Sequence, residues 1–519
     1  MQDDTTTQEI EEKLSERLLG NETVDDYAEN NLFRIDGRQG DISATALMEE
    51  GGDIIVDATG GREGFGGAPL PPEYRDAPFA IAFLVHMGVV FFFAMAWGLP
   101  SLRQKVEASA DDGEDSSTET VSLYGLLLLC LVTCVISIGI SAVSLRVMMH
   151  HAETLVQASL IGSVCFNAFY AIIFLMDGLF WYTGGWVIMF ILTAWYARRV
   201  WKRIPFASSN LRTALSAIQT NAGVCALAYG IAALANLWTI VWILAVVGIS
   251  FKESTCAAGV CKPDLNMVTI IFLILSFYWT IEVFQNVLHV TVSGVVGTWW
   301  FDPQDALSVF SPSIVDSFRR ATTYSFGSIC MGSLLVAIIQ TLETMVRQAR
   351  ENNRNQLLLC ILECFLRLLA RLAKYFNRWA YCYVGLYGFD YVSSGKKAIE
   401  LFEAKAWMPI TTDNLVHYCL LLVSIVVASL SGFLGMLLAE ATGWATTTLG
   451  ENADAWVFLL CFLIGFSMAK ILMNVVRAAV ETVIVAFAEA PGEFQTHHPA
   501  LSNNMIQKWR QVFPDECGF

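Results

Sequence analysis

The 519-residue sequence has few charged residues: only 15% are charged, whereas 55% are hydrophobic. Soluble globular domains carry about 25% charged residues and about 45–50% apolar ones. A chain so poor in charge lacks the side chains to cover a water-exposed surface, which excludes an ordinary soluble globule. It also lacks the basic patch that would favour nucleic-acid binding.

Motifs for catalysis or metal binding are lacking as well. The seven histidines are dispersed, and no His-x-x-x-His or paired-aspartate motif falls within an apolar run. An intramembrane enzyme needs a nucleophile with its base, or a set of metal ligands. We therefore expect a protein that is not an enzyme, with no catalytic residue, no metal and no cofactor.

Most of the thirteen cysteines lie within apolar runs, where a thiol behaves as a small hydrophobic group. Cys256 and Cys261 are the exception, because they share a short polar loop. They form the one plausible disulfide, and neither their spacing nor any partner histidine indicates a zinc site.

The net charge of −16 is concentrated at the N-terminal end of the chain. Residues 1–75 hold 18 acids against 6 bases, a net of −12, which leaves −4 for the remainder. The segment has little apolar periodicity, and we expect no cleaved signal peptide because no basic stretch precedes an apolar core. Its composition predicts an acidic, disordered, cytosolic tail.

The apolar runs predict an all-α polytopic membrane protein, with about ten transmembrane helices over residues 76–490 and a cytosolic tail over residues 491–519. The basic residues at 198–203 place their loop on the cytosolic side. Only Asp177 and Gly178 join the third and fourth spans, which predicts a tight hairpin. The expected spans are residues 77–99, 121–145, 155–176, 179–197, 223–249, 267–301, 324–346, 357–375, 415–440 and 455–487.

The eighth of these spans is ambiguous, because residues 357–375 combine apolar and charged positions. The pattern fits either a span with one polar face or an amphipathic helix in the membrane interface. If both termini are cytosolic, one crossing is needed here, within either 357–375 or 376–402. The charged positions at helical spacing are Glu363, Arg367, Arg371 and Lys374.

The densest basic cluster, RRVWKRIPFAS at residues 198–208, precedes a stretch with helical periodicity that ends at Thr220. One interpretation is an interfacial amphipathic helix on anionic headgroups. The other is that these bases are ordinary orientation charges.

Residues 267–301 form the longest apolar run. As one helix the run would be about 50 Å long, against a hydrocarbon core of about 30 Å. We therefore expect a broken or long tilted helix. It contains Glu282 and His289, and because lipid does not tolerate an unpaired carboxylate, their face is expected to line a water-filled path.

Several separated stretches between residues 72 and 509 resemble the choline transporter-like family. In chain order they are RRVWKRIPFAS, VLHVTVSGVVGTWWF, TTYSFGSICMGSLLVAIIQTLETMVR and FNRWAYCYVGLYGFDYVSSGKKAIELF. The short loop after the first span is similar to that of the fungal, plant and protist members. The resemblance implies a comparable number of spans, cytosolic termini, and transport of choline and ethanolamine without a sodium gradient.

Choline carries a quaternary ammonium, which aromatic faces and a nearby carboxylate can bind. The fifth to seventh spans supply both kinds of group, and Tyr278, Glu282 and Asn286 share one broad helical face. We predict that the substrate is bound by Trp238, Trp242, Tyr278, Trp279, Glu282, Asn286, Trp299 and Tyr324.

Each of these residues also has a structural interpretation. Trp299 suits an interfacial aromatic belt, and Trp238 with Trp242 suits a lipid-facing or core position. Glu282 suits a structural pair with a basic residue, and His289 suits a hydrogen-bonded structural role.

Candidate gating residues are Gly294, Gly297, Arg378 and Asp390. The glycines allow close helix approach or a helix break. Arg378 and Asp390 belong to FNRWAYCYVGLYGFDY, which we interpret as an interfacial or re-entrant cytosolic element.

In the last span, Lys470, Arg477 and Glu481 lie near one helical face. This spacing predicts a cytosolic gate or an interior ion pair, with snorkelling of Arg477 as the alternative.

These observations favour a multi-pass transporter of choline or related amines, either facilitative or proton-coupled, that works by alternating access. The expected partners are a small cationic amine and membrane lipids, and the expected location is the plasma membrane with both termini cytosolic. A non-transporting membrane scaffold or lipid-handling protein is the alternative, in which the acidic tail and the basic interfacial segments would be the working parts.

Overall fold

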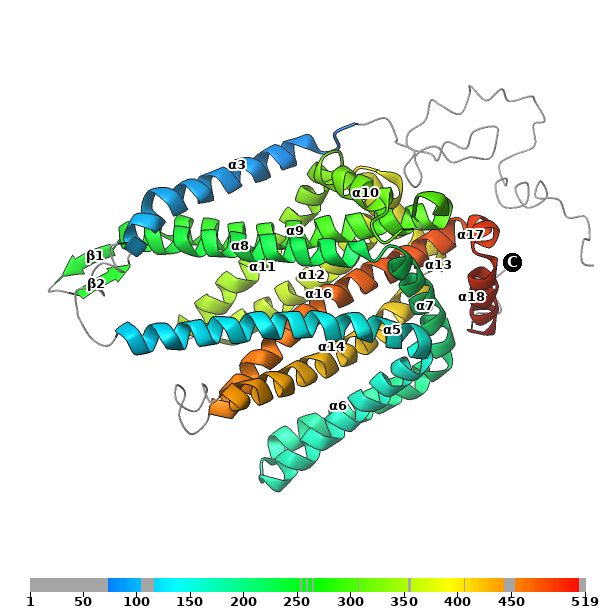
Figure 1. The fold of residues 1–519 in the computed structure, drawn as a ribbon, viewed down its shortest axis with the longest axis horizontal. Helices are drawn as coiled ribbons and strands as arrows, with labels where there is room; N and C mark the ends of the chain where they lie inside the picture. Colours follow the sequence, from blue (N-terminus) through cyan, green and yellow to red (C-terminus); the bar gives the residue numbers. More distant parts are fainter. Residues whose placement is uncertain are drawn as a thin grey trace, which may run out of the picture. The chain divides into compact units, whose positions relative to one another are not determined.

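In the part of the chain that the structure describes, the protein is helical almost throughout, which confirms the expected all-α membrane fold (Figure 1). The computed structural model describes residues 73–103, 116–252, 254–257, 260–263, 266–306, 308–352, 356–405, 407–442 and 453–512. Most of the predicted acidic tail, residues 1–72, lies outside these ranges. The elements are α3 (Ala77–Phe93), η1 (Ala94–Gly98), α5 (Ser116–Met176), α6 (Phe180–Val200), η2 (Trp201–Arg203), α7 (Ile204–Thr220), α8 (Gly223–Lys252), β1 (Ser254–Ala257), β2 (Val260–Pro263), α9 (Met267–Phe301), η3 (Pro303–Ala306), α10 (Pro312–Thr322), α11 (Phe326–Asn352), α12 (Gln356–Tyr387), α13 (Tyr391–Lys405), α14 (Trp407–Thr442), α16 (Ala453–Glu489), α17 (Pro491–His497) and α18 (Pro499–Val512).

Within the described ranges, seven helices are long and apolar enough to cross a membrane. One of them lies in α5, whose backbone leaves helical geometry at His151 and which contains the second and third expected spans. If the two spans in α5 are counted separately, and the less apolar helices α6 and α12 are added, the number of spans reaches ten. The count of about ten therefore stays a prediction.

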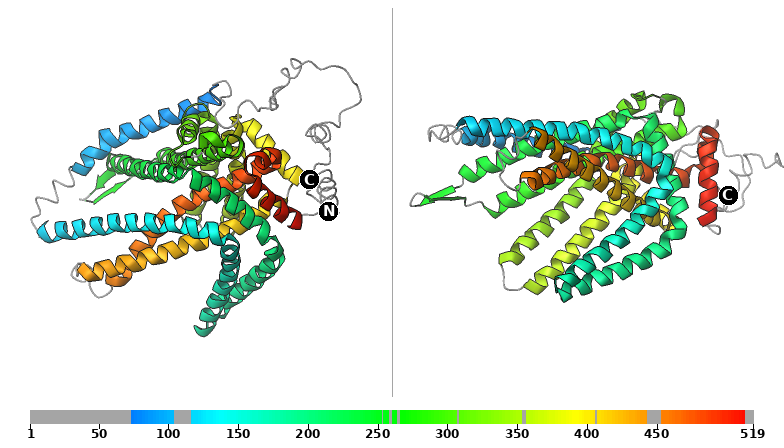
Figure 2. Two further views of the ribbon diagram at one scale, coloured as in Figure 1. Left: turned by 45° about the vertical axis from the view of Figure 1, so that its right-hand side comes forward. Right: turned by 60° about the horizontal axis from the view of Figure 1, so that its bottom comes forward.

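The third and fourth expected spans form the predicted tight hairpin. The second half of α5 and α6 lie side by side in every view (Figures 1 and 2). Gly178 joins them with a φ of 71°, a left-handed conformation that glycine adopts without steric cost.

Helix α9 is the centre of the bundle and is continuous over its 35 residues. The expectation of a long helix is confirmed, and a break at Gly294 or Gly297 is wrong, because both glycines keep helical geometry inside α9. Every residue from Val287 to Trp300 is buried against α10, α11, α12 and α16. Gly294 serves packing instead, because a Cβ at this position would lie 2.7 Å from Ser317 Oγ of α10.

Helix α12 runs without interruption from Gln356 to Tyr387, so it includes the whole of the first candidate for the eighth crossing, 357–375, and the first part of the second, 376–402. The sequence FNRWAYCYVGLY is the C-terminal part of this helix. From Trp379 to Tyr387 every residue is buried, with α9 and α16 among the neighbouring helices, so the expected interfacial or re-entrant element is wrong for these residues. Their burial explains the many large aromatic residues, since indole and phenol rings fill space between helices. The turn that follows α12 is made at Gly388, with a φ of 70°.

The C-terminal helices α17 and α18 pack across the ends of α7, α9 and α16 (Figure 1). The ring of Trp300 stacks on Phe494 with centroids 3.9 Å apart. Trp509 lies against Phe206 and Phe487 and donates a hydrogen bond to Asn210 Oδ1 at 3.1 Å. Helix α7 is therefore enclosed mainly by protein, although its preceding bases in η2 remain partly exposed.

The loop between α8 and α9 contains the hairpin of β1 and β2, in which Cys256 is the register partner of Cys261. The pairing brings the two residues opposite each other on neighbouring strands. The disulfide between them stays a prediction.

Helices α3 and α8 meet through two glycines, Gly98 at the end of η1 and Gly248 in α8. A Cβ at Gly248 would overlap the backbone of Trp97 and Gly98, and a Cβ at Gly98 would overlap the carbonyl of Leu244. The two glycines let the backbones come into direct contact, as small residues do at helix–helix interfaces in membranes.

We expect Gly248→Ala to lower the free energy of unfolding by about 1–3 kcal/mol, because the added methyl group has no space between the two backbones. Thermal unfolding of the purified protein in detergent measures this loss. Gly230→Ala in the same helix is the matched control, because nothing lies within 4 Å of a Cβ at Gly230. Equal unfolding temperatures for the two variants would show that the contact is looser than described.

Candidate functional site

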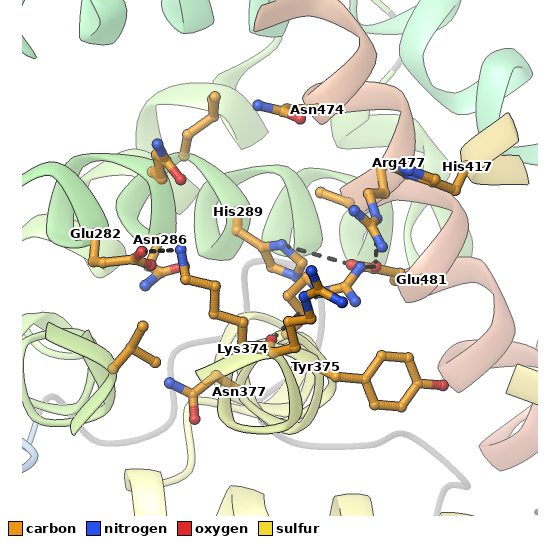
Figure 3. Close-up of a pocket in the computed structure, with 16 residues that line it drawn as sticks. Glu282, Asn286, His289, Lys374, Tyr375, Asn377, His417, Asn474, Arg477 and Glu481 are labelled. Carbon is orange, nitrogen blue, oxygen red and sulfur yellow. Dashed lines mark hydrogen bonds and ion pairs between the residues drawn. The ribbon is translucent and has the colours of Figure 1, made fainter. Parts of the chain in front are cut away.

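A cavity of about 560 Å³ lies between α9, α12 and α16, with single contributions from α11 and α14 (Figure 3). Its volume is within the range of about 300–1,000 Å³ that is usual for small-molecule sites. Charged and amide side chains dominate its wall. The lining residues are Glu282, Gln285, Asn286, Leu288, His289, Val336, Arg371, Lys374, Tyr375, Asn377, Arg378, His417, Asn474, Arg477, Ala478 and Glu481.

Glu282 of α9 forms an ion pair with Lys374 of α12 at one end of the cavity (Figure 3). Lys374 Nζ lies 2.5 Å from Glu282 Oε1, and the side chains are 41% and 10% exposed. The structural pairing considered for Glu282 is thus confirmed. The lysine is the more accessible partner and ends a flexible four-carbon chain.

Glu481 of α16 accepts bonds from two guanidinium groups on one oxygen. Arg378 Nη1 lies 2.6 Å and Arg477 Nε 3.1 Å from Glu481 Oε1. The predicted interior ion pair between Arg477 and Glu481 is confirmed. Its extension to Arg378 joins α16 to α12 and was not predicted.

His289 of α9 adds the third helix to this cluster. Its Nδ1 lies 3.8 Å from Glu481 Oε2, an oxygen with no hydrogen-bond partner among the described residues. Its Nε2 lies 3.5 Å from Cys382 Sγ of α12. The histidine thus faces both the cavity and the packed interior, as its expected structural role requires.

Amide and hydroxyl groups connect the Glu282 end of the cavity to α11. Asn286 Nδ2 donates to Ser333 Oγ at 2.9 Å, and Ser333 Oγ lies 3.4 Å from the hydroxyl of Tyr381. Asn377 donates to the carbonyl of Gly332 at 2.8 Å. Neutral polar groups thus flank the charged pair without adding charge.

The predicted aromatic residues of α8 lie outside this cavity. Trp238 and Trp242 pack beside the buried residues Val90, Ala94 and Ala245, which confirms the core interpretation for both rings. The indole of Trp242 donates to the carbonyl of Leu273 at 3.1 Å.

The two predicted rings of α9 also serve packing. Trp279 stacks on His86 of α3, with centroids 4.9 Å apart, and donates to the carbonyl of Cys330 at 3.0 Å. Tyr278 makes a 2.9 Å hydroxyl contact with Thr344 of α11. Neither residue lines the cavity.

Trp299 and Tyr324 also lie outside the cavity. Trp299 is 2% exposed and stacks on His498, with centroids 4.1 Å apart, so the alternative of an interfacial belt is wrong. Tyr324 packs on Tyr74 just before α3, with centroids 5.3 Å apart. Of the eight predicted binding residues, the structure brings only Glu282 and Asn286 to the cavity.

Among the gating candidates, Arg378 lines the cavity and Asp390 does not. Asp390 directly precedes α13, and its carboxylate accepts hydrogen bonds from the backbone N–H and the hydroxyl of Ser393 at 2.9 and 2.6 Å. Burial alone would raise the pKa of Asp390, but these hydrogen bonds lower it below its ordinary value. The residue is therefore an ionised helix cap.

Comparison with known proteins finds a family model that matches more than half of the chain. The family is described as plasma-membrane choline transporter, and the match covers residues 184–492, including every cavity-lining residue. A protein named PNS1 from Gibberella zeae is 29% identical over 353 residues, 66% of this chain and 63% of that protein. A CTL-like protein from Dictyostelium discoideum is 29% identical over 440 residues, 83% of this chain and 74% of that protein. The chain thus spans slightly less than two thirds of the length of the Gibberella relative.

We expect Glu481→Gln to destabilise the protein by about 3 kcal/mol, because it leaves two partly buried guanidinium groups facing a neutral amide. Thermal unfolding in detergent measures the change. Glu153→Gln is the control, since Glu153 is exposed on α5. An unfolding temperature for Glu481→Gln equal to that of the control would show that the ion pairs are dispensable for stability.

Proposed function

The chain belongs to the choline transporter-like family, and on this premise we propose that it carries choline or a related amine such as ethanolamine across a membrane. The proposed route passes through the cavity between α9, α12 and α16. We place both termini on the cytosolic side, as the distribution of basic residues favours. We place the protein in the plasma membrane, which the description of the matching family supports.

One observation carries the proposal: the buried carboxylate of Glu282 is paired with a lysine that is much more exposed than itself. A carboxylate inside a membrane bundle is costly unless a cation accompanies it. An incoming ammonium group can take the place of the Lys374 ammonium, so that Glu282 exchanges one cation for another and is never left alone. This exchange lowers the energetic cost of releasing substrate as well as of binding it.

Alternating access requires contacts that open and close at the two ends of such a site. The cluster of Glu481, Arg378 and Arg477, with His289 beside it, joins three helices at the other end of the cavity. We propose that this cluster is the gate on that side. Transport is then facilitative, or proton-coupled if His289 takes up a proton when it faces Glu481.

Glu282→Gln is expected to reduce choline uptake into proteoliposomes at least about tenfold, because a neutral amide cannot replace the carboxylate as partner of an ammonium group. Glu440→Gln is the control, since Glu440 is exposed on α14 away from the cavity. Unchanged uptake in Glu282→Gln would disprove the site. Absence of uptake in the wild type would favour the non-transporting scaffold.

If Lys374 competes with substrate, its removal should strengthen binding. We expect Lys374→Met to bind choline about five- to tenfold more tightly than the wild type in calorimetry of the purified protein, because Glu282 then lacks its internal cation. Lys397→Met is the control, because Lys397 pairs with Glu400 on α13. Weaker choline binding by a folded Lys374→Met protein would contradict the exchange of cations.

A further inference from the structure

We propose that Gln285 of α9 binds the hydroxyl group of the substrate, and that the cavity thereby selects amino alcohols over amines that carry only alkyl groups. The inference rests on the proposed function, because it concerns the same cavity and an ammonium group held by Glu282. Choline and ethanolamine differ in the methyl groups on nitrogen but share a hydroxyl group on a short carbon chain. A residue that binds this shared group defines the substrate class.

Glu282 alone cannot make this selection. The attraction between a carboxylate and an ammonium group depends on their charge and distance, and not on what else the amine carries. Glu282 therefore suits any small amine that displaces Lys374. Selection among such amines needs a second group near Glu282 that matches one of them better than the others.

The hydroxyl group of an amino alcohol is both a donor and an acceptor of hydrogen bonds. The lysine and the arginines of the cavity wall can only donate, and its carboxylates, when ionised, can only accept. An amide side chain offers both a donor and an acceptor, so it matches a hydroxyl group whichever way the hydroxyl proton points. Four amides line the described cavity: Gln285, Asn286, Asn377 and Asn474.

Two of these amides are used in contacts between helices. Asn286 of α9 donates to Ser333 Oγ of α11 at 2.9 Å. Asn377 of α12 donates to the carbonyl of Gly332 of α11 at 2.8 Å and accepts a hydrogen bond from the hydroxyl of Tyr391 of α13 at 2.5 Å. Packing of the bundle therefore accounts for both.

Gln285 is not used in this way. It is exposed, lines the cavity, and makes no hydrogen bond with any residue that the structure describes. It follows Glu282 by three residues on α9, and side chains at this spacing are neighbours on a helix, with Cβ atoms about 5–6 Å apart. The short chain of an amino alcohol can thus place its ammonium group at Glu282 and its hydroxyl group at Gln285.

The fourth amide, Asn474, also makes no hydrogen bond within the described ranges. It belongs to α16, where Arg477 of the Glu481 cluster follows it by three residues (Figure 3). The same helical spacing that makes Gln285 a neighbour of Glu282 makes Asn474 a neighbour of Arg477. Gln285 is therefore the better placed of the two amides for an amine bound at Glu282.

The test compares choline with propyltrimethylammonium, in which a methyl group replaces the hydroxyl group, by calorimetry with the purified full-length protein. We expect the wild type to bind choline about five- to tenfold more tightly, which is the usual worth of a hydrogen bond between neutral groups. Gln285→Met, which keeps the length of the side chain, should abolish this preference by weakening choline binding alone. Glu282→Gln should weaken the binding of both cations.

Asn236→Leu is the matched control, because it removes an amide that lies outside the cavity lining and donates to the carbonyl of Ala232 on its own helix. It should keep the full preference for choline. Thermal unfolding in detergent establishes that each variant is folded.

The outcomes separate this inference from the proposed function. Equal binding of the two cations by the wild type would overturn the inference and leave the amine carrier standing. A preference that persists in Gln285→Met, or that is lost in Asn474→Leu alone, would overturn the assignment to Gln285. An equal loss of both cations in folded Gln285→Met would show that the amide supports the cavity without binding a hydroxyl group. Failure of both cations to bind the folded wild type would remove the proposed function as well.

Discussion

A single buried carboxylate, Glu481, holds three central helices together. Its oxygens face Arg378 from α12, Arg477 from its own helix and His289 from α9. Burying these charges is costly unless each is paired, so the three helices must arrive in one register. The same requirement explains why Arg378 lies inside the bundle, although the aromatic-rich sequence around it predicted an interfacial or re-entrant element. The cavity is the space that this register leaves between the helices.

The continuity of α9 and α12 follows from how closely they pack. A Cβ at Gly385 of α12 would lie 2.5 Å from Ser293 Cβ of α9, so glycine brings the two backbones into contact. Thr482 of α16 donates to Ser293 Oγ at 2.9 Å at the same level. Small residues and short hydroxyl contacts thus make a dry layer next to the charged cavity.

Most helices and part of the cavity could be predicted from the sequence, and the predictions that failed did so for physical reasons. The pair of Arg477 and Glu481 could be predicted because both residues lie four positions apart on one helix. The partner of Glu282 could not, since Lys374 is brought to it by packing of α12 against α9. Tryptophan in an apolar run signals a large buried surface but not which neighbour covers it. For this reason Trp242 and Trp279, assigned to a substrate, are found packed on other helices.

The docking of the last two helices bears on the order in which the chain can be assembled. The indole of Trp300 donates to the carbonyl of Ala490, a contact between residues 190 positions apart. As the chain is synthesised, the end of α9 is made long before α17 exists to cover it. Until then the rings of Trp299 and Trp300, at the C-terminal end of α9, lack the residues of the C-terminal segment that pack on them in the folded protein. Biogenesis of the central helix is therefore complete only after the C-terminal segment has left the ribosome, and a chain that stops before residue 490 lacks the cover for its own centre.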